Sequence, residues 1–221
     1  MKTVLTPDEA YRLWAPTYER SEALAILDEQ ARRRLAPDVA PPLLDAACGT
    51  GRRLGPARAG RRRGALGIDA VFEMLREGER EAPVAVADVR ALPFGSGTFG
   101  TAWCRLAIGH LRDPAPAYSE LGRVLAPSGL LFVTDFHPEA ARRGMVRSFR
   151  SGESTFEVEH HVHDLPAHER AAAGAGLAVD GILELVVGEE LRPHFEAAGK
   201  PDLYERQRGQ PVLLALRLRR V

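Results

Sequence analysis

The sequence predicts a doubly wound α/β domain built around a mostly parallel sheet. Short apolar runs with the character of strands recur at 42–46, 64–69, 84–88, 101–106 and 129–136. Segments with a helical pattern lie between several of these runs, including 71–80 and 114–125. Apolar runs of this length, separated by helices, are typical of parallel strands that are covered on both faces.

The chain ahead of the first strand is expected to be helical. Residues 7–35 carry a helical pattern in two pieces, interrupted near Pro16. The stretch TPDE at 6–9 predicts a capped helix start with proline at the first helical position. Prolines at 37, 41 and 42 end this region, and the α/β core begins after them.

Beyond residue 136 the alternation of strands and helices loosens. A polar insertion at 137–165 precedes a predicted helix near 167–175, and two further strand-like runs follow at 178–188 and 211–218. A chain of 221 residues is long enough for one such domain with a buried core. No repeat divides it, so we expect a single domain.

The composition is that of an ordinary soluble globular protein, with 45% hydrophobic and 27% charged residues. The formal net charge of zero gives no electrostatic case for a nucleic acid or an anionic membrane as partner. Arginine runs at 32–34 and 61–63 are interpreted as solvated helix faces and connectors, because acids elsewhere balance them.

The compartment follows from what the sequence lacks. Two cysteines, Cys48 and Cys104, make no disulfide framework, and no metal-ligand spacing accompanies them. The first residues carry no apolar leader, and no run approaches the length of a membrane span. A reduced, cytoplasmic location is therefore expected.

The loop in LLDAACGTGRRL, residues 43–54, follows the first predicted strand and indicates a bound ligand. A dinucleotide fingerprint needs a third glycine after Gly49 and Gly51, and Leu54 stands there instead. A Walker loop needs a lysine, and none is near. Neither phosphate-binding loop fits this sequence.

Acids at the ends of three successive strands favour a different ligand. Asp45 would repel a pyrophosphate but suits a cation such as the ammonium of a methionine moiety, whose carboxylate the loop N–H groups could bind. Asp69 is positioned to accept hydrogen bonds from ribose hydroxyls, and Asp88 from an adenine amino group. The alternative interpretation is that these acids cap the helices that follow them.

On these segments the sequence resembles the class I S-adenosylmethionine-dependent methyltransferases, in particular small bacterial ones of the ubiquinone/menaquinone-biosynthesis type. LLDAACGTGR resembles the first family motif, LGIDAVFEML the second and VAVADVRALPF the third. TAWCRLAIGHLRDP and ELGRVLAPSGLLFVTDFHP resemble the fourth-strand and fifth-strand motifs. AYRLWAPTYER, at 10–20, resembles the aromatic segment that folds over the cofactor in many relatives.

The resemblance implies a Rossmann-like methyltransferase fold with seven strands, the last of them antiparallel and formed by 211–218. It also implies S-adenosyl-L-methionine as cofactor, with no metal. The expected organisation is a helical lid at 1–40, a cofactor-binding half at 41–136 and a substrate-side half at 137–221.

The resemblance also assigns roles to individual residues. The loop backbone would line the methionine end, Asp69 would bind the ribose, Met74 would pack on the adenine, and two tyrosines would close the lid. The predicted cofactor contacts are Tyr11, Tyr18, Asp45, Ala47, Cys48, Gly49, Gly51, Asp69, Ala70, Met74, Asp88, Val89, Arg105, Leu106 and His110.

The sequence departs from the family pattern at two positions. Ala47 stands where relatives usually have glycine, which is tolerable only if its backbone keeps φ negative. Pro56 falls inside the helix expected after the loop and should kink or shorten it.

The candidate catalytic residues are His137, His110, His163 and Tyr18. Histidine can act as a base near neutral pH if the acceptor must lose a proton. For His110 the alternative is a cofactor-shell or helix-start role, and for His137 that of a polar loop residue before Pro138.

A polar stripe in FEVEHHVHDL, residues 156–165, leaves three interpretations open. At strand period, Phe156, Val158, His160 and Val162 share one face, while Glu157, Glu159, His161 and His163 share the other. The polar face could bind a metal, line a substrate pocket or face solvent.

We therefore predict an S-adenosylmethionine-dependent methyltransferase that acts on a small molecule, with O- or N-methylation favoured over C-methylation. The protein is expected to be a monomer or homodimer with no nucleic-acid or membrane partner. Two alternatives are a catalytically silent cofactor-binding or regulatory protein and an NAD(P)-dependent oxidoreductase. The missing third glycine and Asp45 disfavour the oxidoreductase.

Overall fold

The structure is a computed structural model that describes residues 3–20, 23–57, 64–78 and 82–221. A seven-stranded sheet runs through it in the order β4-β3-β2-β5-β6-β10-β9. Its strands are β2 (Leu43–Ala46), β3 (Ala65–Asp69), β4 (Val84–Val86), β5 (Phe99–Arg105), β6 (Leu125–Phe136), β9 (Leu177–Val186) and β10 (Pro211–Arg220).

The fold prediction is confirmed. Strands β2 to β6 pair in parallel, and β10 pairs antiparallel with both β6 and β9. The last strand is thus inserted between two earlier ones. Each predicted run overlaps a strand of the structure, with bounds that differ by at most four residues.

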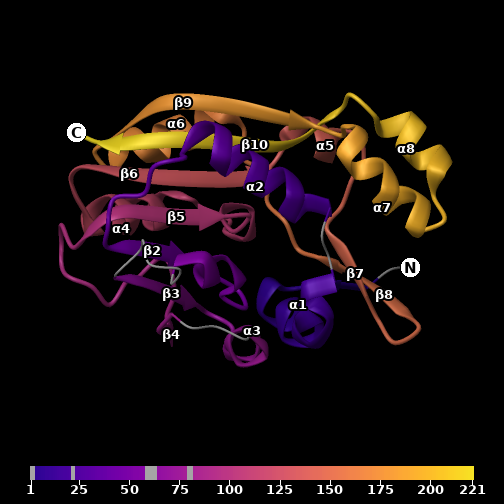
Figure 1. The fold of residues 1–221 in the computed structure, drawn as a ribbon, viewed down its shortest axis with the longest axis horizontal. Coiled ribbons are helices and arrows are strands. Elements are labelled where there is room, and N and C mark those ends of the chain that lie inside the picture. Colours follow the sequence, from indigo (N-terminus) through magenta and orange to yellow (C-terminus); the bar gives the residue numbers. More distant parts are fainter. Residues whose placement is uncertain (1–2, 21–22, 58–63, 79–81) are drawn as a thin grey trace.

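Helices bury the two faces of the sheet in separate cores (Figure 1). On one face α2 (Ala23–Leu35) packs Leu27 and Ala31 against Trp103 and Phe132. On the other face α4 (Ala115–Val124) and α6 (Leu165–Gly174) cover the alternate side chains of the same strands. Because both faces are covered, these strands carry continuous apolar runs.

The N-terminal segment is close to the prediction. Helix α1 (Pro7–Trp14) begins at Thr6, which forms a capping box with Glu9, and Pro7 occupies the first turn. A 3₁₀ turn at Ala15–Arg20, which contains the predicted interruption at Pro16, separates α1 from α2. The strand β1 (Thr3–Leu5) ahead of α1 was not predicted.

The insertion at 137–165 folds onto this N-terminal segment. It contains α5 (Pro138–Arg142), β7 (Ser148–Ser151) and β8 (Ser154–Val158). Strand β8 pairs in parallel with β1 and antiparallel with β7, forming a separate three-stranded sheet. Figure 1 shows α1, β7 and β8 beyond the carboxyl ends of the parallel strands. We call α1, the 3₁₀ turn after it, β1, β7 and β8 the lid.

The predicted alternation through 156–165 is wrong beyond Val158, where β8 ends. The chain turns inward because the N–H of His161 donates to the carbonyl of Gly109 at 2.7 Å. As a result His163 is buried, whereas Val162, which was expected to share the apolar face, is 48% exposed.

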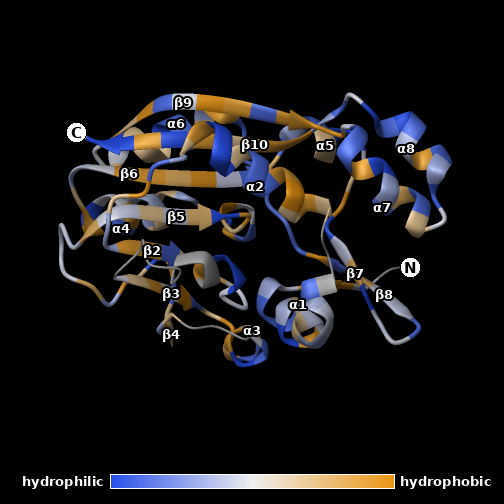
Figure 2. Cartoon of the chain, in the orientation of Figure 1, coloured by the Kyte–Doolittle hydropathy of each residue, from blue (hydrophilic) through white to orange (hydrophobic). Residues whose placement is uncertain are grey.

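Two helices near the C-terminal end, α7 (Arg192–Ala197) and α8 (Pro201–Gln207), were not predicted. They are short, and Figure 2 shows them mostly hydrophilic, in contrast to the hydrophobic strands β5, β6 and β10. Helix α8 is held to the core through the buried Tyr204. No helix among the described residues is long and apolar enough to cross a membrane.

Candidate cofactor and acceptor site

A cavity of about 320 Å³ lies between the carboxyl ends of the parallel strands and the lid. Ala47, Gly49 and Asp69 form its floor, and Tyr11 and Tyr18 form its roof. This is the edge at which open α/β sheets bind their ligands, because the loops from successive strands meet there.

The loop after β2 folds by repeated use of the left-handed backbone region. Ala47, Gly49 and Gly51 have φ values of 64°, 60° and 77°. The expectation that Ala47 keeps a negative φ is therefore wrong. Glycine adopts this region at no steric cost, whereas alanine is strained there because its Cβ approaches the following carbonyl oxygen. The loop retains its turn at the expense of that strain.

Glycine is required at the strand beneath the loop as well. A Cβ on Gly67 of β3 would lie 2.7 Å from both Cys48 Sγ and Leu54 Cδ1. Carbon and sulfur atoms do not approach this closely without displacement. Gly67 therefore permits the loop to lie directly on β3.

Three N–H groups of the loop, which were expected to meet a ligand carboxylate, already have acceptors within the protein. The N–H of Cys48 donates to Ile68, that of Gly49 to the Asp69 carboxylate at 2.8 Å, and that of Gly51 to Cys48. They are thus occupied within the protein and do not wait for a ligand carboxylate. Nor does an α-helix follow the loop, since residues Arg52–Ala57 form a 3₁₀ turn that includes Pro56. The shortening expected from Pro56 is observed.

Asp69 and Asp88 lie at the predicted strand ends and line the cavity. Asp69 accepts from the N–H groups of Gly49 and Val71, at 2.8 and 2.9 Å, and burial raises its pKa. The carboxylate of Asp88 pairs with Arg90 at 2.6 Å, and this partner lowers its pKa. Each carboxylate keeps unused lone pairs, so both can accept further hydrogen bonds from a ligand.

Asp45 lies behind the cavity wall, on the face of the sheet that α2 covers. Both of its carboxylate oxygens are buried without a hydrogen-bond partner, and burial raises its pKa to about 6. Arg53 and Arg105, the cations nearest in effect, are already engaged by Asp28 at 2.9 and 2.7 Å. A buried carboxylate without partners is costly, and a cationic ligand group beside it would remove part of that cost.

The roof of the cavity is a cluster of aromatic rings. Tyr11 stacks on Trp14 with ring centroids 5.7 Å apart, and Trp14 stacks on Phe149 of β7 at 4.8 Å. Tyr18 meets both Tyr11 and Trp14 edge to face. The lid thus brings Phe149 of β7 into one wall with aromatic residues from the start of the chain.

His110 is the predicted histidine that reaches the cavity. Its Nε2 lies 2.9 Å from the Tyr11 hydroxyl. Burial, reinforced by the charge of Arg147, lowers its pKa to about 3. His110 is therefore neutral at physiological pH and only weakly basic.

The other two histidines predicted as bases do not line this cavity. His137 caps α5, accepting from the Glu139 N–H, and its Nε2 lies 3.2 Å from Glu184. His163 is buried with its Nε2 2.8 Å from the Leu111 carbonyl. Both are thus held in structural contacts, which corresponds to the alternative interpretation for His137.

Most of the predicted cofactor residues come together. Asp45, Cys48 and Gly51 are outside the cavity lining, for the reasons above, and the remainder line it: Tyr11, Tyr18, Ala47, Gly49, Asp69, Ala70, Met74, Asp88, Val89, Arg105, Leu106 and His110. Met74 packs against the loop, since a Cβ on Gly49 would lie 3.3 Å from its Cε.

Several lining residues were missed by sequence reasoning, above all Arg53 and Arg147. Arg53 lies in the loop after β2, but in the sequence it is one of many arginines. Arg147 stands in a polar insertion with no motif around it, so the sequence carried no signal for it. Of the two arginine runs interpreted as solvated, Arg32 is mostly buried beside Glu29, and 61–63 lies outside the described residues.

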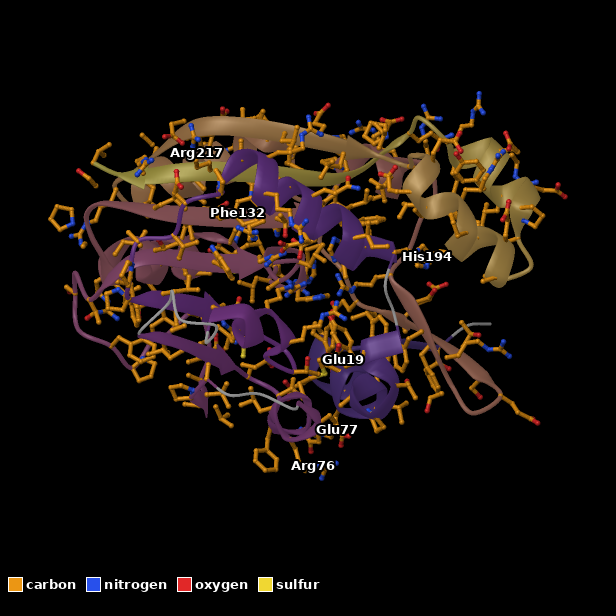
Figure 3. All side chains as sticks on the ribbon, in the orientation of Figure 1. Glu19, Arg76, Glu77, Phe132, His194 and Arg217 are labelled. Carbon is orange, nitrogen blue, oxygen red and sulfur yellow. The ribbon has the colours of Figure 1, made fainter. Side chains whose placement is uncertain are left out.

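A second cavity of about 360 Å³ adjoins the first. The two share Tyr18, Arg53, Leu106 and Arg147 as a common wall. The far side of the second cavity is formed by the start of α2, Phe136 and His194 of α7. Figure 3 labels His194 on α7, Glu19 in the 3₁₀ turn after α1, and Phe132 on β6.

Comparison with known proteins relates part of the chain to methyltransferases. Residues 44–133 match the sequence profile of the family described as a methyltransferase domain. A demethylmenaquinone methyltransferase of Renibacterium salmoninarum is 32% identical over 146 residues, which cover 60% of this chain and 61% of that protein. A malonyl-[acyl-carrier protein] O-methyltransferase of Methylovorus is 28% identical over 150 residues, covering 58% and 49%. The chain thus spans about half to 61% of the length of these curated relatives.

Solved structures agree on the fold. A putative S-adenosylmethionine-dependent methyltransferase from Listeria monocytogenes superposes with a TM-score of 0.68 at 17% identity, over 91% of this chain and 100% of that one. A geranyl diphosphate methyltransferase in complex with geranyl diphosphate and sinefungin gives 0.64 at 19%, over 89% and 77%.

The fold is the one shared with the S-adenosylmethionine-dependent methyltransferases above, and residues 44–133 match the methyltransferase-domain family. S-adenosylmethionine is the cofactor of this class, and the residues present fit it. Asp69 and Asp88 are among the carboxylates that line the cavity, and the buried, unpartnered Asp45 behind its wall suits a nearby cation.

Proposed function

We propose that this protein binds S-adenosylmethionine in the first cavity and transfers its methyl group to a small molecule held in the second. The observation that carries the proposal is the continuous wall shared by the two cavities, Tyr18, Arg53, Leu106 and Arg147. A wall of this kind brings a donor on one side within reach of an acceptor on the other.

Binding of the cofactor would depend on two of the acids that line the first cavity, Asp69 and Asp88. Asp69 has lone pairs free for ribose hydroxyls, and Asp88, at the end of the next strand, could accept from the adenine amino group. Met74 would pack against the adenine. When bound, the cofactor supplies an electrophilic methyl group.

The lid would contribute orientation and the exclusion of water, which are the main requirements of methyl transfer. Tyr11 and Tyr18 lie over the cavity, and Trp14 backs them. Such a roof keeps water from the reacting atoms and restricts the acceptor to one approach.

The weak basicity of His110 bears on the acceptor. Its pKa of about 3, which follows from burial, makes it a poor proton acceptor, and burial likewise raises the pKa of the Tyr11 hydroxyl above its ordinary value. This arrangement favours an acceptor that is already nucleophilic without a strong base, such as an oxygen anion or a neutral amine. We therefore propose O- or N-methylation. Some structural neighbours, among them a geranyl diphosphate C-methyltransferase from Streptomyces coelicolor, methylate carbon.

Calorimetric titration with S-adenosylhomocysteine tests the cofactor assignment. We expect the wild-type protein to bind it and Asp69→Asn to bind roughly 100-fold more weakly, because a carboxylate that accepts from ribose hydroxyls is lost. Asp113→Asn, an exposed acid that caps the neighbouring α4, is the matched control and should leave affinity unchanged.

Three outcomes would contradict the cofactor assignment or the proposed activity. Equal affinity of Asp69→Asn and wild type would remove the ribose assignment. Stabilisation by NAD rather than by S-adenosylhomocysteine in thermal unfolding would favour an oxidoreductase. If the cofactor binds but no acceptor panel yields S-adenosylhomocysteine, a silent cofactor-binding protein is the better description. The monomeric or dimeric state and the cytoplasmic location stay predictions.

A further inference from the structure

Arg147 is a buried arginine at the junction of the two cavities. It precedes β7, and its side chain is 9% exposed. The guanidinium lies over the rings of Tyr11 and Trp14, at 5.6 and 6.0 Å from their centroids. Its backbone carbonyl accepts from the N–H of Val158, which fixes it to β8. The lid therefore holds this cation in place at the cavity wall.

No carboxylate among the described residues lies within ion-pair distance of Arg147. The two other arginines of the second cavity are neutralised, Arg52 by Glu19 at 3.0 Å and Arg53 by Asp28 at 2.9 Å. The Nε of Arg147 is buried without a hydrogen-bond partner. A buried charge without a counterion is expensive, so a structure that keeps one usually has a ligand for it.

No acidic side chain of the described residues lines the second cavity beside Arg147. Within the described part of the chain, the second cavity is lined by three arginines and His194 and by no aspartate or glutamate. The acids of the first cavity, Asp8, Asp69 and Asp88, belong to the side assigned to the cofactor. The second cavity thus carries a positive charge that no acid of its lining compensates.

We propose that Arg147 binds a carboxylate of the methyl acceptor, so that the substrate is a small organic acid. This inference rests on the proposed function. A guanidinium supported on aromatic faces still presents its edge, which matches the two oxygens of a carboxylate. One unpaired cation matches one negative charge, which favours a carboxylate over a phosphate dianion. The cavity of about 360 Å³ suits a small molecule.

The same carboxylate chemistry is present in the methionine end of the cofactor, so the two sources must be separated. Arg147 faces both cavities. If it held the cofactor carboxylate, its loss would weaken S-adenosylhomocysteine but not methylthioadenosine, which lacks the amino-acid end. If it holds the acceptor, neither cofactor analogue is affected.

The experiment is a titration of the S-adenosylhomocysteine-saturated protein with acetate, malonate and benzoate, with their amides, and with phenyl phosphate. We expect at least one carboxylate to bind, and its amide to bind at least tenfold more weakly. Arg147→Met should weaken the carboxylate by roughly 10- to 100-fold, the range for a hydrogen-bonded charge, with S-adenosylhomocysteine affinity unchanged. Arg147→Lys should retain part of the affinity.

Arg150→Met is the matched control, since Arg150 lies on β7 and is exposed. It should change neither affinity. Trp14 lies against Arg147, so its fluorescence provides a second readout in the wild-type protein that needs no variant. If Arg147→Met does not fold, the comparison of carboxylate and amide in the wild type and the Arg147→Lys variant decide the question.

Several results would overturn the inference. Carboxylates and amides that bind equally, or no carboxylate bound at all, would exclude an acid subsite. Preference for phenyl phosphate would replace the carboxylate by a phosphate. Weakened S-adenosylhomocysteine with normal methylthioadenosine would assign Arg147 to the cofactor. Failure of the wild type to bind S-adenosylhomocysteine would instead refute the proposed function.

Discussion

The two walls of the site are built in different ways. The cofactor wall consists of loops at the ends of β2, β3 and β4, each close in sequence to the strand that positions it. The lid wall joins residues far apart in sequence, such as Tyr11 and Arg147, through pairing of β1 with β8. Local motifs therefore determine the first wall, and long-range packing determines the second.

The two walls also differ in how they are stabilised. The cofactor wall is anchored in the two large cores on either side of the sheet. The lid is held by a small cluster in which Ala10, Trp14, Phe149 and Val158 are buried. A region with few buried apolar side chains opens at lower free energy than the main core. We therefore expect the lid to open without unfolding of the sheet.

The largest expected effect comes from a substitution that destabilises the lid and leaves the sheet folded. Trp14→Ala removes stacking on Tyr11 and Phe149, at a cost of about 3 kcal/mol, the lower end for loss of a buried aromatic ring. Amide hydrogen exchange in β7 and β8 should become roughly 100-fold faster. Amides of β5 and β6 should change little.

The control for this prediction is Val4→Ala on β1, a lid residue that is 59% exposed. It should leave exchange unchanged. Equal acceleration across lid and sheet in Trp14→Ala would mean that the two regions unfold together, and the distinction between the walls would fail.

The pH dependence of the free energy of unfolding tests the cofactor wall through Asp45. Burial raises the pKa of Asp45 from its ordinary value of 3.8 to about 6, so the folded state favours the protonated acid. The contribution of Asp45 to the free energy of unfolding is complete below the pKa of the unfolded state, 3.8, and is lost as the pH rises through about 6. It amounts to about 2–3 kcal/mol. Between pH 4 and pH 7 this residue alone lowers the free energy of unfolding.

Denaturant unfolding of wild type and Asp45→Asn at several pH values provides the measurement. Other buried acids, such as Asp28 and Asp135, have lowered pKa values and act in the opposite sense. The difference between the two proteins cancels them. The advantage of Asp45→Asn should therefore grow from pH 4 to pH 7. A constant difference would show that Asp45 is not perturbed.

The smallest effect concerns the strain in the ligand loop. Ala47→Gly relieves the left-handed backbone but adds freedom to the unfolded chain, for a net stabilisation of roughly 0.5–1 kcal/mol. Ala46→Gly, one residue earlier in β2, has no such strain to relieve and should destabilise by a similar amount. Thermal unfolding midpoints that move in the same direction for both would contradict the assignment of strain to Ala47.

Much of the cofactor wall could be predicted because its residues follow strands that are recognisable from apolar runs. Asp69 and Asp88 lie where predicted, since the end of a parallel strand fixes the side-chain position. The details of the loop could not be predicted, because its N–H groups bond to Ile68 and Asp69 on the neighbouring strand. The candidate bases stay predictions for a related reason: a residue type indicates a possible base, but burial, as at His110, decides its basicity.

The sequence by itself determined the positions of the strands along the chain, the position of the ligand loop and the resemblance that predicts the cofactor, because these depend on periodicity and on short motifs. Only the tertiary structure decided which side chains form the lid wall. The pairing of β1 with β8 brings the start of the chain against residues 147–158, and no local pattern encodes a contact over that separation. Arg147, which no sequence motif marks, is placed in this way at the wall that the two cavities share.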